Sequence, residues 1–507
     1  MKMKIKILFL LLSVLFINCT GDNIGSWTAM SPAGSETETS VFLLWDKVAN
    51  AVSYRVAYNN GKRISSTKHT YLSVDGLEPD SEYGFEIIPL DVAGTPLKDA
   101  SFVKIRTKAK TGIINIKDFG AKSGNGYINT VAIQKAIDVC PVGGIVYIPD
   151  GIFYSGALFL KSNMTLYLEE GAVLQGTTDL DEYPLIPNRF EGWEIRTPCA
   201  LLNAGSIDRN QKNCLENLTI RGKGTIRGGG EKLAHQMKEA GGERNMGRLI
   251  CFMNGKNITI EGLTIEESPC WTVHLIYCKN ILCHNLIIHS DVIRGDGIDP
   301  DSSSDCYIYN CTFSNGDDCI AIKSGKNPEG NLIGIPTKNV RIVDCKFLKG
   351  HGISIGSEMS GGVSNVLIQD CVAGDLLNGL QIKATPERGG YVENIRVEDC
   401  SLQKIRLLTQ LNYNNDGEAA KVLPVFKSMK FFNLNMTDAP SGQTLIEING
   451  FDAPRHYTQD IFFKNILLPD KSTVQIRHCT DLTFENVCLP DNRKPVYEIT
   501  ESDRIIK

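Results

Sequence analysis

One short pattern recurs along the second half of this chain. Each repeat begins with a polar residue, continues with apolar residues at alternating positions, and carries an apolar residue or a cysteine six positions after its start. The first six repeats follow one another at intervals of 23 to 34 residues. These six starts and two later ones are Asn257, Asn280, Asp305, Asn339, Asn365, Asn394, Asp460 and Asp481. Such self-similarity is typical of a solenoid, in which residues one coil apart stack at about 4.8 Å.

The repeat predicts an all-β chain folded as a parallel β-helix. Its variable intervals indicate loops inserted between regular coils. Leucine-rich repeats form the rival solenoid, but their leucine spacing is absent here. The chain has 507 residues, and its 47 glycines suit many tight turns, so we assign residues 112–507 to one long solenoid domain. An amphipathic stretch at residues 129–137 predicts a helix that covers the open end of the solenoid.

Sixteen cysteines would suggest a disulfide scaffold in a short chain, but this chain is long. No pair has the short spacing of a zinc site, so we predict no bound metal. Four of them occupy one repeat position, where other repeats carry Leu, Ile or Val. They are Cys311, Cys345, Cys371 and Cys400. We therefore predict that these four are buried as small hydrophobic residues in a stacked column.

The amino terminus has the pattern of an export signal. Lys2, Lys4 and Lys6 precede an apolar run at residues 7–17, which is too short to span a membrane. We predict a lipoprotein-type signal at residues 1–19, with Cys19 as the lipidated residue that anchors the protein to a membrane. An ordinary secretory signal is the alternative. Either signal predicts an exported protein, in the periplasm or at the outer membrane or cell surface.

A different pattern occupies residues 27–108. Short alternating stretches, separated by turn signals, predict about seven strands and a small β-sandwich. The segment resembles a fibronectin type III domain, with Trp45, Tyr54, Leu77 and Tyr83 at its core positions. It carries no cluster of charges and no metal motif. We expect it to act as a spacer or platform, with sugar binding as the second interpretation.

Three aspartates within the solenoid are candidate catalytic residues. Asp317 and Asp318 are adjacent, and Asp296 precedes them by about one coil, so the stacking brings all three to one face. Glycoside hydrolysis needs one protonated carboxyl and one carboxylate, and like charges raise the pKa of at least one acid in such a cluster. Because neighbouring strand residues face opposite ways, the two adjacent acids share a site only where the backbone bends, next to Gly316. An Asp-Asp pair alone would be a solvated turn.

From about residue 114 onward the chain resembles glycoside hydrolase family 28, the polygalacturonases and their relatives. Four motifs carry the resemblance in the family's order: Asp-Gly-Ile-Asp at 296–299, Gly-Asp-Asp-Cys-Ile-Ala at 316–321, Gly-His-Gly-Ile-Ser-Ile-Gly-Ser at 350–357, and Ile-Lys at 382–383. The resemblance implies a right-handed parallel β-helix of the pectin-lyase type. It also implies an inverting hydrolase that needs no cofactor and cleaves galacturonosyl linkages in pectin.

The resemblance also implies a role for each site residue. Asp317 is the general acid, and Asp296 and Asp318 hold and deprotonate the attacking water. His351 tunes the acid or orients the sugar, and Lys383 meets a uronate carboxylate. Asp299 and Asp301 either face the same cleft or serve the structure.

Two departures from the family pattern concern the substrate. Arg294-Gly295 replaces the usual Asn-Thr before the first aspartate, and Gln381 replaces the arginine before Ile382-Lys383. The second change removes a bidentate donor for a uronate carboxylate. One hypothesis is that Arg294 or Arg388 supplies the missing guanidinium. The other is that the leaving-side sugar is not an ordinary galacturonate, as in rhamnogalacturonan.

The same reasoning predicts the partners and the mode of action. The N-terminal spacer and the loop at residues 325–337 suggest exo action on a blocked cleft. We expect a pectic poly- or oligosaccharide substrate and a monomer. The net charge of −5 gives no reason to expect nucleic acid. Two alternatives remain: a calcium-dependent pectate lyase, in which the carboxylates are metal ligands, and a non-catalytic glycan-binding solenoid or adhesin.

Overall fold

The computed structural model of the chain describes residues 27–59, 61–210, 215–411 and 417–507. The predicted signal and its lipidation residue Cys19 lie outside the described residues. Within those residues, no helix is both long and apolar enough to cross a membrane.

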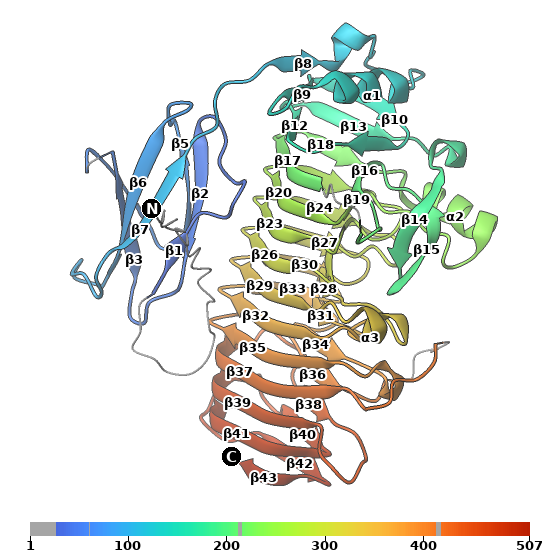
Figure 1. The fold of residues 1–507 in the computed structure, drawn as a ribbon. Coiled ribbons are helices and arrows are strands. Elements are labelled where there is room, and N and C mark those ends of the chain that lie inside the picture. Colours follow the sequence, from blue (N-terminus) through green and yellow to red (C-terminus); the bar gives the residue numbers. More distant parts are fainter. Residues whose placement is uncertain (1–26, 60, 211–214, 412–416) are drawn as a thin grey trace, which may run out of the picture.

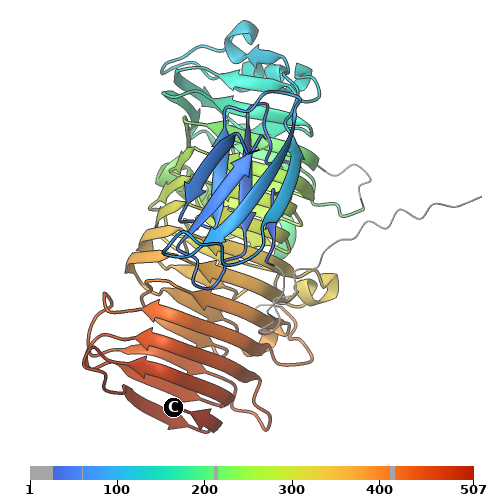
Figure 2. The ribbon, with the colours of Figure 1, turned by 90° about the vertical axis from the view of Figure 1, so that its left-hand side faces the viewer.

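Three long parallel sheets wind around one axis and form the body of the molecule (Figures 1 and 2). Each sheet takes its strands in chain order, so that each coil adds one strand to the stack. The prediction of an all-β, right-handed parallel β-helix is confirmed.

The first of these sheets has 14 strands within the described residues. They are β8 (Ile113–Asn115), β9 (Ile145–Ile148), β12 (Met164–Leu168), β17 (Leu215–Gly222), β20 (Gly255–Glu261), β23 (Lys279–His284), β26 (Ser304–Tyr309), β29 (Thr337–Val343), β32 (Val363–Gln369), β35 (Tyr391–Glu398), β37 (Val425–Asn435), β39 (Thr458–Leu467), β41 (Cys479–Cys488) and β43 (Asp503–Ile506).

The second sheet, described over 12 strands, carries the candidate site. Its strands are β11 (Leu158–Leu160), β16 (Leu202–Gly205), β19 (Ile250–Met253), β22 (Val273–Ile276), β25 (Ile298–Asp301), β28 (Ile320–Ile322), β31 (Ile353–Ile355), β34 (Leu380–Lys383), β36 (Ile405–Leu408), β38 (Thr444–Asn449), β40 (Thr473–Arg477) and β42 (Val496–Thr500).

The third sheet, of eight described strands, completes the wall of the solenoid. It comprises β10 (Gly151–Ser155), β13 (Ala172–Gly176), β18 (Thr225–Arg227), β21 (Thr264–Glu266), β24 (Ile287–Ser290), β27 (Thr312–Asn315), β30 (Lys346–Gly350) and β33 (Val372–Leu376).

The polar residue that starts each repeat has a structural role. All eight starts have a left-handed backbone, with φ near +55°, a conformation that Asn and Asp adopt more readily than most residues. Their side chains form a ladder from coil to coil. For example, the Asn280 amide donates to Asn257 Oδ1 at 3.0 Å, and the Asn365 amide donates to Asn339 Oδ1 at 3.1 Å. Asn163, Asn217 and Ser428 are further starts with the same backbone, and Ser428, with φ +57°, escaped the sequence pattern because it is neither Asn nor Asp.

The core of the solenoid consists of inward-facing residues that stack along its axis. Phe431, Phe463 and Phe484 stack in successive coils, with ring centroids 4.4 and 4.9 Å apart. Aromatic stacking of this kind adds about 0.5–1.5 kcal/mol per pair to burial itself. The four-cysteine column lies in the same core, each residue at most 2% exposed. The predicted burial of these cysteines is confirmed.

A helix and several insertions decorate the β-helix. The predicted helix is α1 (Thr130–Val139), which packs Ile133, Ala136 and Ile137 onto the N-terminal end of the core (Figure 1). An antiparallel hairpin of β14 (Leu185–Phe190) and β15 (Trp193–Pro198) stands out from an early coil. The remaining helices are α2 (Gly230–Gly241), α3 (Glu329–Ile333), η1 (Ile116–Phe119), η2 (Leu180–Glu182) and η3 (Pro386–Arg388).

The N-terminal segment forms two antiparallel sheets around a core of its own. Their strands are β1 (Ala29–Met30), β2 (Ser40–Trp45) and β5 (Tyr71–Asp75) in one sheet, and β4 (Arg63–Thr67), β3 (Ser53–Tyr58), β6 (Glu82–Leu90) and β7 (Ser101–Arg106) in the other.

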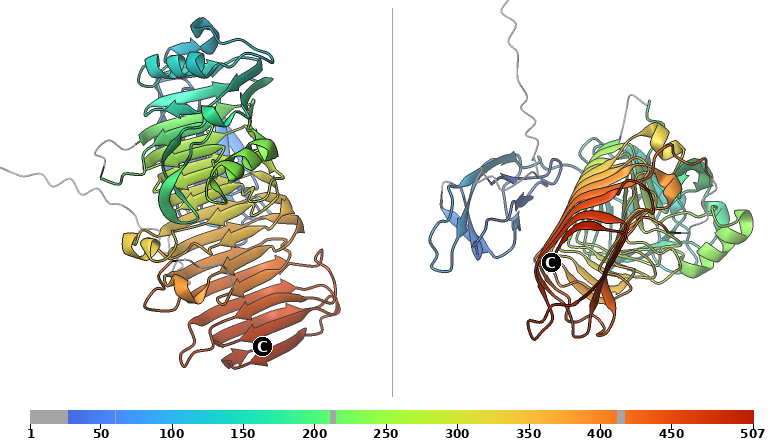
Figure 3. Two further views of the ribbon diagram at one scale, coloured as in Figure 1. Left: turned by 90° about the vertical axis from the view of Figure 1, so that its right-hand side faces the viewer. Right: turned by 90° about the horizontal axis from the view of Figure 1, so that it is seen from below.

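This N-terminal unit packs against the outer face of the 14-stranded sheet (Figures 1 and 3). Phe42 and Leu44 of β2 are buried against Tyr307 and Tyr309 of β26. Hydrogen bonds and ion pairs surround this apolar contact, such as the one from the Tyr71 hydroxyl to Asp344 Oδ2 at 2.6 Å. The unit therefore lies on a different sheet from the candidate site.

Candidate active site

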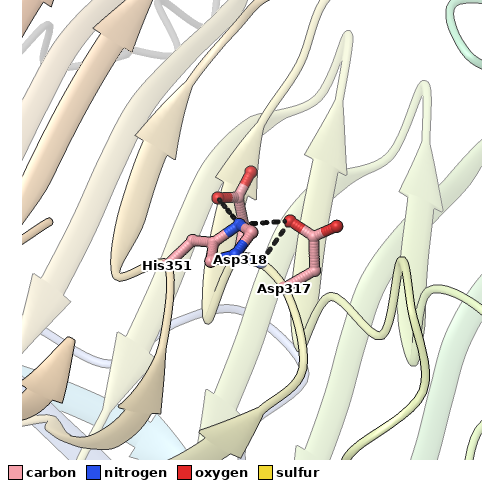
Figure 4. Close-up of side chains that lie close together, drawn as sticks. All are labelled: Asp317, Asp318 and His351. Carbon is pink, nitrogen blue, oxygen red and sulfur yellow. Dashed lines mark hydrogen bonds and ion pairs between the residues drawn. The ribbon is translucent and has the colours of Figure 1, made fainter. Parts of the chain in front are cut away.

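The backbone bends where the two adjacent aspartates lie. Residues 316–319 connect β27 to β28 and belong to neither strand. Gly316 is needed there, because a Cβ atom on it would lie 2.4 Å from the Val292 carbonyl oxygen. The bend frees Asp317 and Asp318 from strand alternation, and both side chains reach the same region (Figure 4). The expected bend next to Gly316 is therefore present.

One backbone N–H group links the three predicted acids. The Asp318 N–H donates to Asp317 Oδ1 at 2.9 Å and to Asp296 Oδ1 at 3.2 Å. Asp296 and Asp318 are each 3% exposed, whereas the Asp317 side chain is 27% exposed. The structure thus gathers all three just before the neighbouring strands β25 and β28 of the 12-stranded sheet, and the Asp317 side chain is the most exposed of the three.

His351 lies beside the two adjacent acids. Its Nδ1 is 2.9 Å from Asp317 Oδ1 and 4.0 Å from Asp318 Oδ1 (Figure 4). The hydrogen bond to Asp317 raises the pKa of His351 above its usual value. Burial acts to raise the pKa of Asp317, but the hydrogen bond and charge of His351 outweigh it, so that this pKa is lowered. The two groups therefore behave as a pair that holds one proton.

Lys383 contacts the third acid. Its Nζ lies 3.3 Å from Asp318 Oδ2, and the Ser354 hydroxyl donates to Asp318 Oδ1 at 2.6 Å. Both oxygens of the buried Asp318 carboxylate therefore accept hydrogen bonds. Such partners hold a buried carboxyl group in one orientation.

Lys323 is a site residue that the sequence reasoning missed. Its buried Nζ lies 3.2 Å from Asp296 Oδ2 and 3.7 Å from Glu358 Oε2, and 4.2 Å from the centroid of the Trp271 ring. Burial acts to lower the pKa of Lys323, but the surrounding carboxylates outweigh it and raise this pKa well above its usual value. The signal was available: Ile322-Lys323 repeats the Ile-Lys pattern at 382–383 in the same register, two coils earlier.

Two further buried acids lie next to this cluster on β25. Burial and the charge of Asp299 raise the pKa of Asp296 well above its usual value. Burial likewise raises the pKa of Asp299 to about 8, and Lys323 Nζ lies 3.8 Å from Asp299 Oδ1. Asp301 instead forms an ion pair with Arg189 and a hydrogen bond with His274, both at 3.2 Å. Asp299 therefore adjoins the site, whereas Asp301 anchors the β14–β15 hairpin.

The predicted substrate-binding residues are less closely grouped. Arg294 Nη1 lies 2.6 Å from Glu191 Oε1 at the tip of the β14–β15 hairpin. Arg388 is buried, and its guanidinium donates to the Ser357 carbonyl and to Asn327 Oδ1, both at 2.8 Å. Gln381 lies on β34, directly beside Ser354 of the neighbouring strand.

The carboxylates fit a calcium ion poorly. Asp317, Asp318 and His351 each offer one ligand atom, and these atoms all lie within 4.8 Å of one another. Calcium prefers six to eight oxygen ligands, however, and here one of the three is an imidazole nitrogen. The Lys383 ammonium group also forms an ion pair with Asp318 Oδ2 at 3.3 Å. A second cation would meet repulsion at this carboxylate.

A parallel β-helix that presents clustered carboxylates beside an imidazole defines the class as a glycan-acting enzyme with acid–base chemistry. Residues 205–488 match the family model of glycosyl hydrolases family 28. The chain belongs to this family and is a polygalacturonase-like glycoside hydrolase.

Individual relatives cover most of the chain. It is 27% identical to an exo-poly-alpha-D-galacturonosidase of Dickeya chrysanthemi, over 91% of this chain and 90% of the relative. A probable polygalacturonase of Vitis vinifera is 32% identical over 62% of this chain and 67% of its own length. The structure of a Yersinia enterocolitica family 28 exopolygalacturonase is similar, with a TM-score of 0.85, 24% identity, and coverage of 94% of this chain and 98% of that one.

Proposed function

We propose that this protein is an inverting, exo-acting hydrolase that releases galacturonate from the ends of pectic chains. The observation that carries the proposal is the gathering of Asp296, Asp317 and Asp318 between two lysine ammonium groups. The first relative above and the Yersinia structure are both exo-acting enzymes on galacturonate polymers by name. Homogalacturonan and rhamnogalacturonan fragments are the candidate polymers.

We assign Asp317 as the general acid, because it is the most exposed of the three acids and shares a proton with His351. In the free enzyme that proton resides on the imidazole. A bound uronate adds negative charge and excludes water, both of which raise the pKa of a carboxyl group. The proton then moves to Asp317 and on to the leaving oxygen. Inversion requires a base on the opposite face of the sugar, a role that we assign to Asp318, while Asp296, whose raised pKa favours its protonated form, helps to hold the attacking water.

Exo action is supported by a wall beside the site. We use "wall" for the β14–β15 hairpin together with residues 325–337. The two parts meet, because the Lys326 N–H donates to the Gly192 carbonyl at 3.1 Å and the Glu194 N–H donates to Glu329 Oε2 at 2.8 Å. The Glu191–Arg294 ion pair links the hairpin to the turn that carries Asp296. A wall at this place would stop a polymer from continuing past the cleavage point.

We further propose that residues 27–108 are a fibronectin type III-like brace and that the protein is exported as a lipoprotein anchored through Cys19. Seven described strands in two sheets, docked on the β-helix, support the brace. The basic and apolar amino terminus supports export. Replacement of Cys19 by Ala would abolish acylation, which mass spectrometry of the membrane fraction detects. A membrane-bound Cys19→Ala protein would contradict the anchor.

Product analysis with a chelator present tests the enzymatic proposal. We expect early release of saturated galacturonate alone from oligogalacturonates. Asp317→Asn should lower kcat by about 10²–10⁴-fold, the usual contribution of a general acid. An unsaturated product that disappears with the chelator would indicate a lyase instead. Binding without turnover, equal in the wild type and Asp317→Asn, would indicate a glycan-binding solenoid.

A further inference from the structure

Gln381 belongs to a column of outward-facing side chains that starts at the catalytic cluster. Ser354 of β31 is in register with Gln381 of β34, which is in register with Arg406 of β36. Ser354 donates to Asp318, so that the column begins at a catalytic carboxylate. Arg406 stands two coils beyond Ser354, about 10 Å along the axis at the spacing of neighbouring strands.

The surroundings of Arg406 leave its terminal nitrogens available. Its side chain is 28% exposed, and its Nε donates to Glu447 Oε2 at 2.9 Å. Lys404 Nζ lies 3.2 Å from the same oxygen. Among the described residues, no hydrogen bond reaches Nη1 or Nη2 of Arg406, and Glu447 is its ion-pair partner. Two cations around one carboxylate leave a net charge of +1 at this point of the sheet.

The other guanidinium groups considered for this role have partners already. Arg294 forms an ion pair with Glu191 in the wall. Along the solenoid, the acids lie between Arg294 and Gln381. Arg388 is 2% exposed and is held by Ser357 and Asn327. Neither guanidinium group therefore offers its terminal N–H donors at the outward face of β34 and β36.

We propose that Arg406, with Lys404 beside it, binds the carboxylate of a uronate residue on the leaving side of the scissile bond. This inference rests on the proposed function. The guanidinium that Gln381 lacks would be supplied one coil further on in the same column. An ordinary galacturonate then suits the leaving side, without a different polymer.

The chemistry of the two residues fits this role. Glu447 holds the guanidinium by its Nε edge, which orients Nη1 and Nη2 as a planar pair of donors. Such a pair binds a carboxylate through two parallel hydrogen bonds. Burial acts to raise the pKa of Glu447, but the hydrogen bond and charge of Arg406 outweigh it and lower this pKa. Glu447 therefore remains charged and keeps its hold on Arg406.

The variant Arg406→Gln tests the inference with two trigalacturonates, one with free leaving-side carboxyls and one methyl-esterified there. For the free acid we expect KM to rise about 10- to 100-fold, the usual worth of charge-assisted hydrogen bonds. We expect kcat to stay within about threefold, because the contact is made equally in the ground state and the transition state. For the methyl ester, the KM of Arg406→Gln should equal the KM of the wild-type enzyme.

Two further variants sharpen the result. Arg477→Gln removes an exposed arginine from β40 of the same sheet, two coils beyond Arg406, and should leave KM for both substrates unchanged. Gln381→Arg, added to Arg406→Gln, should lower KM for the free acid again. Equal thermal midpoints for all variants show that each is folded.

An Arg406→Gln enzyme whose KM for the free acid equals that of Arg477→Gln would overturn the inference. So would an equal rise in KM for the free acid and the ester, since that would report packing and not charge recognition. Wild-type protein without activity on either trigalacturonate would instead overturn the proposed function. The two failures are therefore distinguishable.

Discussion

At the scale of single residues, the proton shared by His351 and Asp317 predicts a pH dependence. Because the pKa of His351 is raised, the protonated pair persists above pH 6.5, and activity should fall as pH rises through that raised value. The imidazole faces Asp317, Asp318 and Lys383. In His351→Gln the proton rests on Asp317 alone, so the basic limb of kcat/KM should move to lower pH. At pH 7 we expect a loss of about 10- to 100-fold, with a smaller loss near pH 5.

His289→Gln is the matched control for this variant. His289 is a half-exposed histidine, 3.4 Å from Asp291, outside the acid cluster. Its replacement should leave the pH profile unchanged. A basic limb that stays in place in His351→Gln would show that the imidazole does not hold the catalytic proton.

At the scale of elements, the wall predicts how the enzyme selects chain ends. Gly192 at the hairpin tip has φ +83°, and a Cβ atom there would lie 2.4 Å from the Lys326 backbone nitrogen. Gly192→Ala should therefore push the hairpin away from residues 325–337. We expect oligomers among the early products from polygalacturonate, and a faster fall in viscosity for each bond cleaved.

Gly126→Ala provides the control for backbone strain alone. Gly126 has φ +95°, but a Cβ atom there would have no atom within 4 Å. Both variants carry the cost of a left-handed alanine, about 1–2 kcal/mol, and only Gly192→Ala disturbs the wall. Galacturonate as the sole early product of Gly192→Ala would refute the role given to the wall.

At the scale of the whole molecule, the N-terminal unit should unfold together with the β-helix. Phe42 is 2% exposed, stacks on Tyr71 and meets Tyr309 edge-on, each with ring centroids 5.7 Å away. Phe42→Ala should cost about 3–5 kcal/mol at this contact. Calorimetry should then show two transitions in place of one, while kcat changes little because the site lies on another sheet. Phe102→Ala, at a 69% exposed position, should preserve the single transition.

The sequence predicted the solenoid well because one residue in each coil has to adopt a left-handed backbone. Asn and Asp mark that position, and the pattern lapsed at Ser428, where serine takes the same conformation. The acid cluster followed from the coil spacing. The sequence did not predict the roles of Lys323 and Arg406, because these roles depend on which side chains the stacking of coils brings beside them. The blocked cleft expected from residues 325–337 and the N-terminal segment stays a prediction for the loop, whereas the N-terminal unit lies on a different sheet from the acids.

The buried cysteines have a practical consequence for the study of this molecule. All fourteen described thiols are free, and thirteen of them are buried. Cys311, Cys345, Cys371 and Cys400 belong to four successive coils, so each becomes reactive only when its own coil opens. The rate at which a thiol reagent labels each cysteine in mild denaturant therefore reports when its coil opens. The order of labelling gives the direction in which the solenoid unravels.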